Sequence, residues 1–576
     1  MPEITPRDIP AAALQYLLDS GYPPALARVY AARGITDSPQ LDTSLGALLP
    51  LDYLKGAHEM ACLLANAIAA HYKILVIADY DADGATACAV AVRGLRSFGA
   101  QVGFIVPNRF EYGYGLTPEI VHLASQQHPD ILLTVDNGIA SVAGVAEANR
   151  LGMQVLVTDH HLPGDVLPPA ACIVNPNQPG CTFPSKSLAG VGVMFYVLLA
   201  LRAELRSRGQ MTEDRGRKLI DLLDLVALGT IADVVKLDQN NRILVQQGLR
   251  RIRAGRACAG INALLQVAGK MPGKVSSQDL GFTVGPRLNA AGRLDDMSLG
   301  INCLLADDAA TAMQIATRLD ALNRERRSIE ADMQDSALAA LEEINGGRPG
   351  AHGAPYGAVE AVCLVLFDES WHQGVIGILA SRLKDKFHRP VIAFARANNG
   401  ELKGSGRSIA GLHLRDALDL VSKRHPSLIN KFGGHAAAAG LSIAEADFPE
   451  FAAAFEQVSG ELLSASDLAQ RIETDGALEQ DEMSLEVARL LDEHVWGQGF
   501  PAPQFNDSFA VQNQRVVGEK HLKLRLGVQG KFIEAILFGH NEPLPKQIHA
   551  VYSLSVNEYN GTQSLQLIIR HWRAGE

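Results

Sequence analysis

Between residues 73 and 175 the chain alternates short, continuously apolar runs with stretches of helical character. Apolar runs of this length are typical of parallel strands that are buried on both faces. Their alternation with helices predicts a doubly wound α/β sheet, in which ligands bind at the carboxyl ends of the strands. The runs are Ile74–Ala78, Val102–Val106, Ile131–Val135, Val155–Thr158 and the shorter Ala171–Val174.

Acidic residues stand directly after three of these runs. The first run leads into Asp79-Tyr80-Asp81-Ala82-Asp83-Gly84, the third into Asp136-Asn137-Gly138, and the fourth into Asp159-His160-His161. Parallel strands lie about 4.8 Å apart, so these side chains converge within the span of two metal ions roughly 3.5–4 Å apart. Crowded carboxylates take up protons unless a cation balances them. The recurrence therefore predicts a metal centre at the carboxyl edge of the sheet.

Each acidic site also has a structural explanation when it is taken alone. Asp83 could cap the following helix, Asp-Asn-Gly is a common turn, and Asp159 could cap a helix while the histidines pack. An EF-hand loop is excluded, because its glycine position and its terminal Glu are missing. Oxygen ligands with one or two imidazoles and no cysteine favour Mn²⁺ or Mg²⁺, with Zn²⁺ and Co²⁺ still open. We expect two divalent ions, Mn²⁺ before Mg²⁺, and hydrolysis of a phosphate ester.

The acidic motifs resemble those of a known superfamily. ADYDADG, VDNG, TDHH and ALGTIADVV match, in order and approximate spacing, the motifs of the DHH phosphoesterases. Within that superfamily, PRLNAAGRLDD (286–296), WHQGVIGILASRL (371–383), GSGRS (404–408) and KFGGHAAAAG (431–440) are similar to segments of the bacterial RecJ single-strand-specific exonucleases. The resemblance covers nearly the whole chain. It implies a metal-dependent enzyme that degrades single-stranded DNA processively from 5′ to 3′ in recombination and DNA repair.

The resemblance also assigns roles to individual residues of the acidic motifs. Asp79, Asp159 and His161 match supporting catalytic positions. Related two-manganese pyrophosphatases carry a His four residues before their first motif aspartate, where this chain has Ile77, and Asp79 is an alternative ligand there. The implied metal ligands are Asp81, Asp83, Asp136, His160 and Asp233, with Asp136 bridging the ions.

Residues outside these motifs are predicted to hold the substrate. Arg287 is the expected contact to the scissile phosphate, with a surface salt bridge as the competing explanation. The glycines of GSGRS and KFGGHAAAAG would let the backbone approach a phosphate, although such glycine-rich turns are commonly structural. A lone histidine after a strand, such as His372, is more often structural as well. The predicted substrate-binding residues are Arg109, Tyr114, Asn289, Arg293, His372, Ser405, Arg407 and His435.

The chain is too long for one core, since it has 576 residues, and we expect several domains. Helical patterning at 11–18 and 25–32, a long charged helix at 309–341, a Gly/Pro-rich linker at 346–353, and alternating runs such as His521–Val528 mark the divisions. Basic residues of the last region, Arg515, Lys520, His521, Lys523, Arg525 and Lys531, are predicted to line a groove for single-stranded DNA. The expected parts are an N-terminal helical lead-in (1–50), a DHH catalytic domain (51–305), a connecting helix (306–345), an α/β DHHA1-type domain (346–464) and an OB-like β-barrel (465–576).

Cysteine content, apolar runs and net charge indicate the cellular compartment and the kinds of partner to expect. The seven cysteines form no CxxC pair, which indicates unpaired thiols in a reducing compartment and disfavours structural zinc. No signal peptide and no membrane-length apolar run is visible, so we expect a cytoplasmic protein without membrane contact. A net charge of −11 argues against a nucleic-acid partner, but bound divalent ions would offset part of it. The resemblance implies single-stranded DNA, a single-stranded-DNA-binding protein and a RecQ-type helicase as partners of a monomer.

Two other functions share part of this pattern. A DHH-family phosphodiesterase of nanoRNA or cyclic dinucleotides has a similar two-domain core but needs no OB-like tail. A Cdc45-like non-catalytic DNA-replication scaffold resembles the family but has lost the metal-binding acids, which are all present in this chain.

Overall fold

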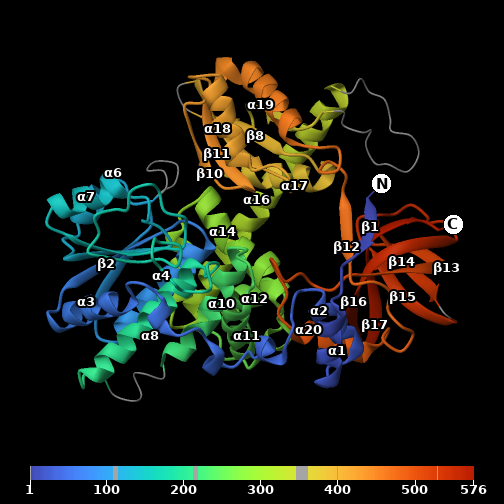
Figure 1. Ribbon diagram of the computed structural model, residues 1–576, viewed down its shortest axis with the longest axis horizontal. Coiled ribbons are helices and arrows are strands. Elements are labelled where there is room, and N and C mark those ends of the chain that lie inside the picture. Colours follow the sequence, from blue (N-terminus) through green and yellow to red (C-terminus); the bar gives the residue numbers. More distant parts are fainter. Residues whose placement is uncertain are drawn as a thin grey trace. The chain divides into compact units, whose positions relative to one another are not determined.

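A computed structural model describes residues 2–107, 115–211, 218–344, 361–397, 400–528 and 530–575. The chain forms two compact units. The larger unit comprises Pro6–Leu322 and Thr474–Glu576, and the smaller one joins the residues up to Thr5 with Asn323–Glu473. Figure 1 shows the elements of both units in sequence colours.

The larger unit contains the predicted parallel sheet (Figure 1). Its strand order is β3-β2-β4-β5-β6, and every neighbouring pair is parallel. All five apolar runs are confirmed as strands, with ends shifted by only a residue or so. They are β2 (Lys73–Ala78), β3 (Gln101–Ile105), β4 (Ile131–Val135), β5 (Gln154–Thr158) and β6 (Cys172–Val174).

Helices cover both faces of this sheet, which explains why its strands lack polar residues. Ile74 and Val76 face a core that includes α3 (Ala57–Ala69), α4 (Ala82–Ser97) and α8 (Gly190–Ser207). Leu75 and Ile77 face a separate core built with α6 (Pro118–Ser125) and α7 (Val142–Arg150). The chain therefore has the doubly wound architecture that its sequence predicts. The strand order turns at β2, with β3 on one side and β4 on the other, which is where such sheets bind ligands.

A helical layer follows the sheet in the larger unit. It begins with a 3₁₀ turn, η4 (Lys218–Leu222), that continues into α10 (Leu223–Ala232). A π-helical turn, η6 (Leu280–Val284), runs directly into α14 (Gly285–Leu294), which contains the PRLNAAGRL segment. The other helices of this layer are α11 (Gln239–Arg253), α12 (Ala259–Val267), α13 (Ser277–Asp279) and α15 (Ser298–Leu305). The predicted long helix is α16 (Ala309–Ile344).

The smaller unit has a mixed sheet in the order β10-β11-β9-β8-β7. GSGRS and KFGGHAAAAG, which we expected to form glycine-rich turns, lie largely in its strands. The glycines are needed for packing: a Cβ on Gly404 would lie 2.5 Å from a ring carbon of Phe394, and one on Gly406 would lie 2.8 Å from Leu414. The elements are β7 (Leu364–Phe367), α17 (Ile376–Phe387), β8 (Val391–Arg396), β9 (Glu401–Arg407), α18 (Leu414–Arg424), β10 (Lys431–Gly434), β11 (Ala438–Ala444) and α19 (Phe448–Leu462).

The C-terminal region is a closed five-stranded barrel, β13-β14-β15-β17-β16, as predicted. The parallel pairing of β15 with β17 closes it, and the other pairs are antiparallel. The first strand was not anticipated from the sequence, because a bulge between Val511 and Asn513 disturbs its alternation of apolar and polar residues. The strands are β13 (Phe505–Val517), β14 (His521–Val528), β15 (Lys531–Leu537), β16 (Gln547–Tyr559) and β17 (Thr562–Ala574).

The N-terminal helices α1 (Ala11–Asp19) and α2 (Pro24–Ala31) agree with the predicted helical patterning. They pack against the segment that precedes the barrel. Arg33 forms a two-bonded ion pair with Asp475, at 2.7 and 3.1 Å, and the Tyr30 hydroxyl lies 2.8 Å from Nδ1 of His494. The remaining elements are β1 (Glu3–Pro6), β12 (Arg471–Thr474), α20 (Leu485–Glu493) and the 3₁₀ turns η1 (Ser38–Leu41), η2 (Leu45–Ala47), η3 (Leu51–Tyr53), η5 (Pro272–Lys274) and η8 (Glu445–Asp447).

All seven cysteines are free thiols, in agreement with the sequence prediction. Within the described ranges, no helix combines the length and the apolar character that crossing a bilayer requires. The predicted linker at 346–353 lies outside the described residues.

Candidate metal centre

The loop after β2 places three aspartates at the edge of the sheet. Asp79 is buried, and Asp81 caps α4 by accepting hydrogen bonds from the N–H groups of Asp83 (2.9 Å) and Gly84 (3.0 Å). The residue that caps α4 is therefore Asp81, whereas the structural explanation of the sequence assigned the cap to Asp83. A Cβ on Gly84 would lie 2.5 Å from the Asp79 carbonyl oxygen, so this tight turn requires glycine.

Asp83 lies in the first turn of α4 and is fully buried. Its two carboxylate oxygens accept hydrogen bonds from the backbone N–H groups of Gly190 (2.7 Å) and Val191 (2.9 Å), at the N-terminus of α8. Burial and the nearby charge of Asp81 nevertheless raise the pKa of Asp83 to about 7. The α8 terminus thus holds this carboxylate in place while the neighbouring acids repel it.

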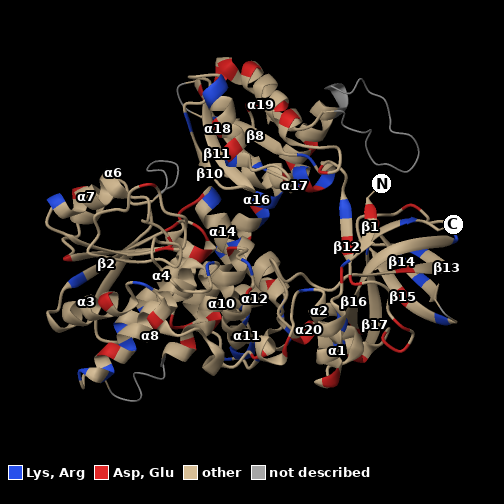
Figure 2. Cartoon of the chain, in the orientation of Figure 1, with Lys and Arg blue, Asp and Glu red and all other residues tan. Residues whose placement is uncertain are grey.

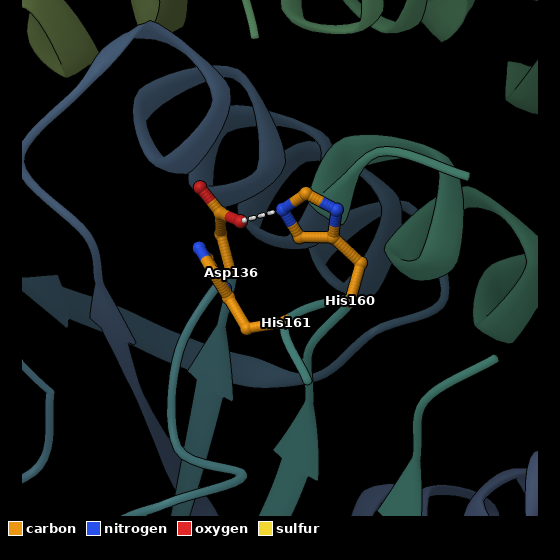
Figure 3. A group of neighbouring side chains, drawn as sticks. All are labelled: Asp136, His160 and His161. Carbon is orange, nitrogen blue, oxygen red and sulfur yellow. Dashed lines mark ion pairs between the residues drawn. The ribbon is translucent and has the colours of Figure 1, made fainter. Parts of the chain in front are cut away.

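Three carboxylates lie around one imidazole nitrogen. Nε2 of His160 lies 3.1 Å from Oδ1 of Asp136, 3.5 Å from Oδ2 of Asp233 and 3.9 Å from Oδ2 of Asp83. Figure 3 shows the His160 ring directed at the Asp136 carboxylate beyond the ends of the strands. Asp136 follows β4, His160 follows β5, and Asp233 follows α10. The fold therefore brings together residues that are far apart in the sequence.

The backbone at Asp136 is unusual, because its φ of 62° lies in the left-handed region. A non-glycine residue adopts this conformation only when its surroundings hold it there, and such residues gather at functional sites. Its N–H donates to the Thr158 carbonyl (3.0 Å), and a Cβ on Gly190 would lie 2.5 Å from its Oδ1. Burial, followed by the charges of Asp83, Asp81, Asp233 and Asp79, raises the pKa of Asp136 well above its usual value.

These side chains fit a divalent metal. Three overlapping groups have possible ligand atoms within 4.8 Å of one another: Asp136-His160-His161, Asp83-His160-Asp233 and Asp79-Asp81-Asp136. Oδ2 of Asp233 is buried and accepts no hydrogen bond from the described residues, as expected of an atom directed at a cation. The pKa of Asp233 is raised by burial and by Asp83, Asp81 and Asp79. Carboxylate oxygens with one or two imidazoles suit Mn²⁺ or Mg²⁺.

Asp159 differs from the other acids because backbone and imidazole groups occupy its carboxylate. Its Oδ2 accepts from the Ile139 N–H (2.9 Å), and its Oδ1 accepts from the N–H groups of His160 (2.7 Å) and His161 (3.0 Å). Oδ1 also lies 2.7 Å from Nδ1 of His161. Burial alone would lower the pKa of His161, but this hydrogen bond with Asp159 raises it to about 9. Asp159 thus orients His161 and favours its protonated form.

Residues of α14 contact the Asp79–Asp83 loop, the preceding turn η6 and helix α16. Nε and Nη2 of Arg287 pair with Asp320 at 3.0 and 2.9 Å, and Nη1 donates to the Thr283 carbonyl (2.6 Å). The side-chain oxygen of Asn289 accepts from the Ala82 N–H at the start of α4 (2.8 Å). The salt bridge that competed with phosphate binding at Arg287 therefore exists, and Asn289 braces the loop. Arg293 lies on the same helix and is half-buried.

In the smaller unit, Ser405 and Arg407 lie on the same face of β9. Nη1 of Arg407 donates to the Ser405 hydroxyl (3.1 Å) and to the Gly406 carbonyl (2.7 Å), and burial lowers the Arg407 pKa. Among the described residues, no carboxylate forms an ion pair with Arg407. Nδ1 of His372 accepts from the Gly374 N–H (3.1 Å), which closes the turn before α17. The His435 side chain is exposed. Arg109 and Tyr114 lie outside the described residues.

Comparisons with known proteins identify three regions of the chain. The profile of the DHH family, N-terminal domain, matches residues 73–230, that of the DHHA1 domain matches 358–461, and that of the RecJ OB domain matches 474–571. A curated relative, the single-stranded-DNA-specific exonuclease RecJ of Dickeya dadantii, is 50% identical over 566 residues, which is 96% of each chain.

Two crystal structures from Thermus thermophilus are similar over 100% of this chain. RecJ in complex with Mn²⁺ has a TM-score of 0.81 at 32% identity, with 79% of that chain covered. RecJ in complex with Mg²⁺ has a TM-score of 0.76 at 30% identity, with 78% covered. Both ions are the divalent cations that the acidic cluster fits.

Proposed function

The chain belongs to the family of RecJ single-stranded-DNA-specific exonucleases, and on this basis we propose that it hydrolyses single-stranded DNA from the 5′ end, in recombination and DNA repair. The observation that carries the proposal is the convergence of Asp136, Asp83 and Asp233 on Nε2 of His160. A nanoRNA or cyclic-dinucleotide phosphodiesterase would need no OB barrel, and a Cdc45-like scaffold would not need this set of acids. Both alternatives are therefore less well supported.

The proposed metal ligands are Asp81, Asp83, Asp136, His160 and Asp233. Asp136 belongs to two of the overlapping ligand groups, which supports its role as the bridge between two ions. Asp79 shares a group with Asp81 and Asp136, which supports it as a further ligand. When bound, divalent ions lower the pKa of water and offset the charge that builds on phosphate oxygens.

We assign positioning and proton-transfer roles to the neighbouring histidine and aspartate. Asp159 binds Nδ1 of His161, and Nε2 is the atom that would exchange a proton with a substrate oxygen. Because Asp159 accepts four hydrogen bonds from protein groups, it acts through His161 and not as a metal ligand.

Phosphate groups of the substrate would be held by Arg407 and Ser405. A half-buried guanidinium with no acidic partner among the described residues is costly unless an anion binds it. Gly377 leaves the space beside these side chains, since a Cβ there would lie 2.9 Å from the Ser405 hydroxyl and 3.0 Å from Nη2 of Arg407. The resemblance supports further contacts from Arg109, Tyr114, Arg287, Asn289, Arg293, His372 and His435.

The barrel would provide a further binding surface for the strand. Arg515 on β13 and Lys523 on β14 are directly opposite each other in the register of the two strands. Figure 2 shows basic residues on these strands. The guanidinium of Arg525 lies 4.9 Å from the ring centre of Phe532, which is 58% exposed. Cations next to an exposed ring are typical of sequence-tolerant binding to single strands.

The domain boundaries, the oligomeric state, the cellular compartment and the protein partners are proposals as well. We propose the five-part division at residues 50, 305, 345 and 464, a monomer in the cytoplasm, and interactions with a single-stranded-DNA-binding protein and a RecQ-type helicase. They are supported by the family membership alone.

The polarity is tested with one oligonucleotide labelled at either end, in Mn²⁺. A 5′ label should be released at once as mononucleotide, while a 3′ label should stay in long fragments until late in the reaction. A duplex of the same sequence with blunt ends should be degraded far more slowly. Early release of the 3′ label, or equal rates on both substrates, would contradict the proposal.

A further inference from the structure

Two exposed apolar residues lie on segments that border the metal centre. Phe282, on η6, is 78% exposed, and Val234, directly after Asp233, is 62% exposed. Exposed apolar residues that are scattered over a surface need no explanation. What distinguishes these two is how their backbones are held.

Val234 has a φ of 61°, in the left-handed region. This conformation is a true outlier for a β-branched residue, and the position after a helix is usually taken by glycine. Its N–H donates to the Ile231 carbonyl (3.3 Å) and closes the end of α10. Because most of the side chain faces solvent, its burial does not compensate for the strain. A strained, exposed residue beside a proposed metal ligand points to a role in binding.

Phe282 is held against the same end of α10. Its turn approaches α10 through two glycines: a Cβ on Gly281 would lie 3.1 Å from Cγ2 of Ile231, and one on Gly285 would lie 3.2 Å from Cβ of Ala232. Phe282 lies between these glycines, so its backbone is beside the residues that lead into Asp233. The turn is π-helical, and such turns are frequent at functional sites.

The helix that continues from this turn is fixed to the other side of the metal centre. Asn289 accepts from the Ala82 N–H, and a Cβ on Gly292 would lie only 2.0 Å from the Tyr80 carbonyl oxygen. The continuous element 280–294 therefore contacts both the Asp79–Asp83 loop and the end of α10. All these residues belong to the larger unit, so packing within that unit sets the place of the Phe282 ring relative to the acids.

We infer that Phe282, together with Val234, forms a stacking platform for a nucleobase of the strand that the metal centre cleaves. The inference rests on the proposed function. A single strand has no pairing partner, and an exonuclease that removes every nucleotide in turn needs a contact that any base can make. The π-face of an aromatic ring provides it, because every base has a π-face of its own.

The test combines the substitution Phe282→Ala with the removal of single bases from the substrate. Substrates carry one abasic nucleotide, moved one position at a time from the 5′ end, and kcat and KM are measured for each. For the wild-type protein, one or two positions should raise KM about 5- to 150-fold, the range of stacking on one base. For Phe282→Ala, KM on intact DNA should rise by a similar factor, and the abasic nucleotide at that position should add nothing. Phe282→Trp should restore the wild-type profile.

Controls separate this inference from the proposed function. Tyr72→Ala removes an aromatic ring, 48% exposed, next to the amino end of β2 and should change neither constant. An unchanged abasic profile in Phe282→Ala, or a loss of kcat at constant KM, would overturn the platform although the wild-type protein still degrades single strands. Failure of the wild-type protein on all intact strands would instead overturn the proposed function.

Val234→Gly gives a second measurement. Glycine relieves the left-handed strain, so the melting temperature should stay equal or rise, while KM for intact single strands increases severalfold. A lower melting temperature with an unchanged KM would show that Val234 serves folding and would remove it from the platform.

Discussion

Nε2 of His160 lies 3.1 Å from Oδ1 of Asp136, and these residues follow neighbouring parallel strands of one sheet. The relation follows first from the sheet, since strands in register present the residues after their carboxyl ends side by side. With Asp83 and Asp233 also within 4 Å of this nitrogen, the site concentrates negative charge that a divalent cation would balance.

Asp136→Asn is expected to abolish metal-dependent nuclease activity and to stabilise the metal-free protein. Loss of a residue that only supports a ligand costs about 10- to 100-fold in metal affinity, so loss of the proposed bridge should cost more. The metal-free melting temperature should rise, because Asn removes one of the repelling carboxylates. Nuclease assays and thermal melts with and without Mn²⁺ check both. A lower metal-free melting temperature with a normal Mn²⁺ response would contradict the assignment.

Asp159→Asn tests whether Asp159 supports His161 or binds a metal ion. The amide has no negative charge to favour a protonated His161, so activity should fall about 10- to 100-fold. The number of Mn²⁺ ions bound, measured by calorimetry, should stay that of the wild-type protein. A reduced number of bound ions would make Asp159 a ligand.

Arg407→Gln should raise KM for single-stranded DNA about tenfold or more, since hydrogen bonds to charged groups contribute about 1.5–3 kcal/mol. The value of kcat should change less. Arg382→Gln is the matched control in the same unit, because Arg382 is exposed and already pairs with Glu330. Equal effects of the two substitutions would rule out a specific phosphate contact at Arg407.

Stability should fall in acid through His494. Burial, and then the charge of Arg253, lower the His494 pKa to about 4. Because the unfolded state binds the proton more tightly, this contribution is complete above pH 6.5 and is lost as the pH falls towards 4, by at most about 3 kcal/mol. In His494→Gln, which keeps an acceptor for Tyr30, the melting temperature should fall less over this range. Parallel curves for the two proteins would contradict the prediction.

The sheet and the position of its acids could be predicted from the sequence because two-sided burial leaves a continuous apolar run, which is a strong signal. The barrel was predictable from alternation, except for β13, where a bulge interrupts the period. Glycines misled the prediction for β9: Gly404 and Gly406 make room for Phe394 and Leu414, which belong to other elements of the sequence.

The site itself was only partly predictable. Strand order implies that Asp136 and His160 meet, but no periodicity connects them with Asp233, which reaches the centre on α10, so only the family resemblance pointed to it. Likewise, the pairing of Arg287 with Asp320 and the strain at Val234 depend on tertiary packing. Local sequence carries no trace of such contacts.

Anomalous scattering from crystals grown with Mn²⁺ would locate a divalent-metal centre built on Asp136 and His160. We predict two peaks roughly 3.5–4 Å apart, one within coordinating distance of Nε2 of His160 and both within reach of the Asp136 carboxylate. Manganese peaks only elsewhere on the protein, with none beside these two residues, would contradict the account.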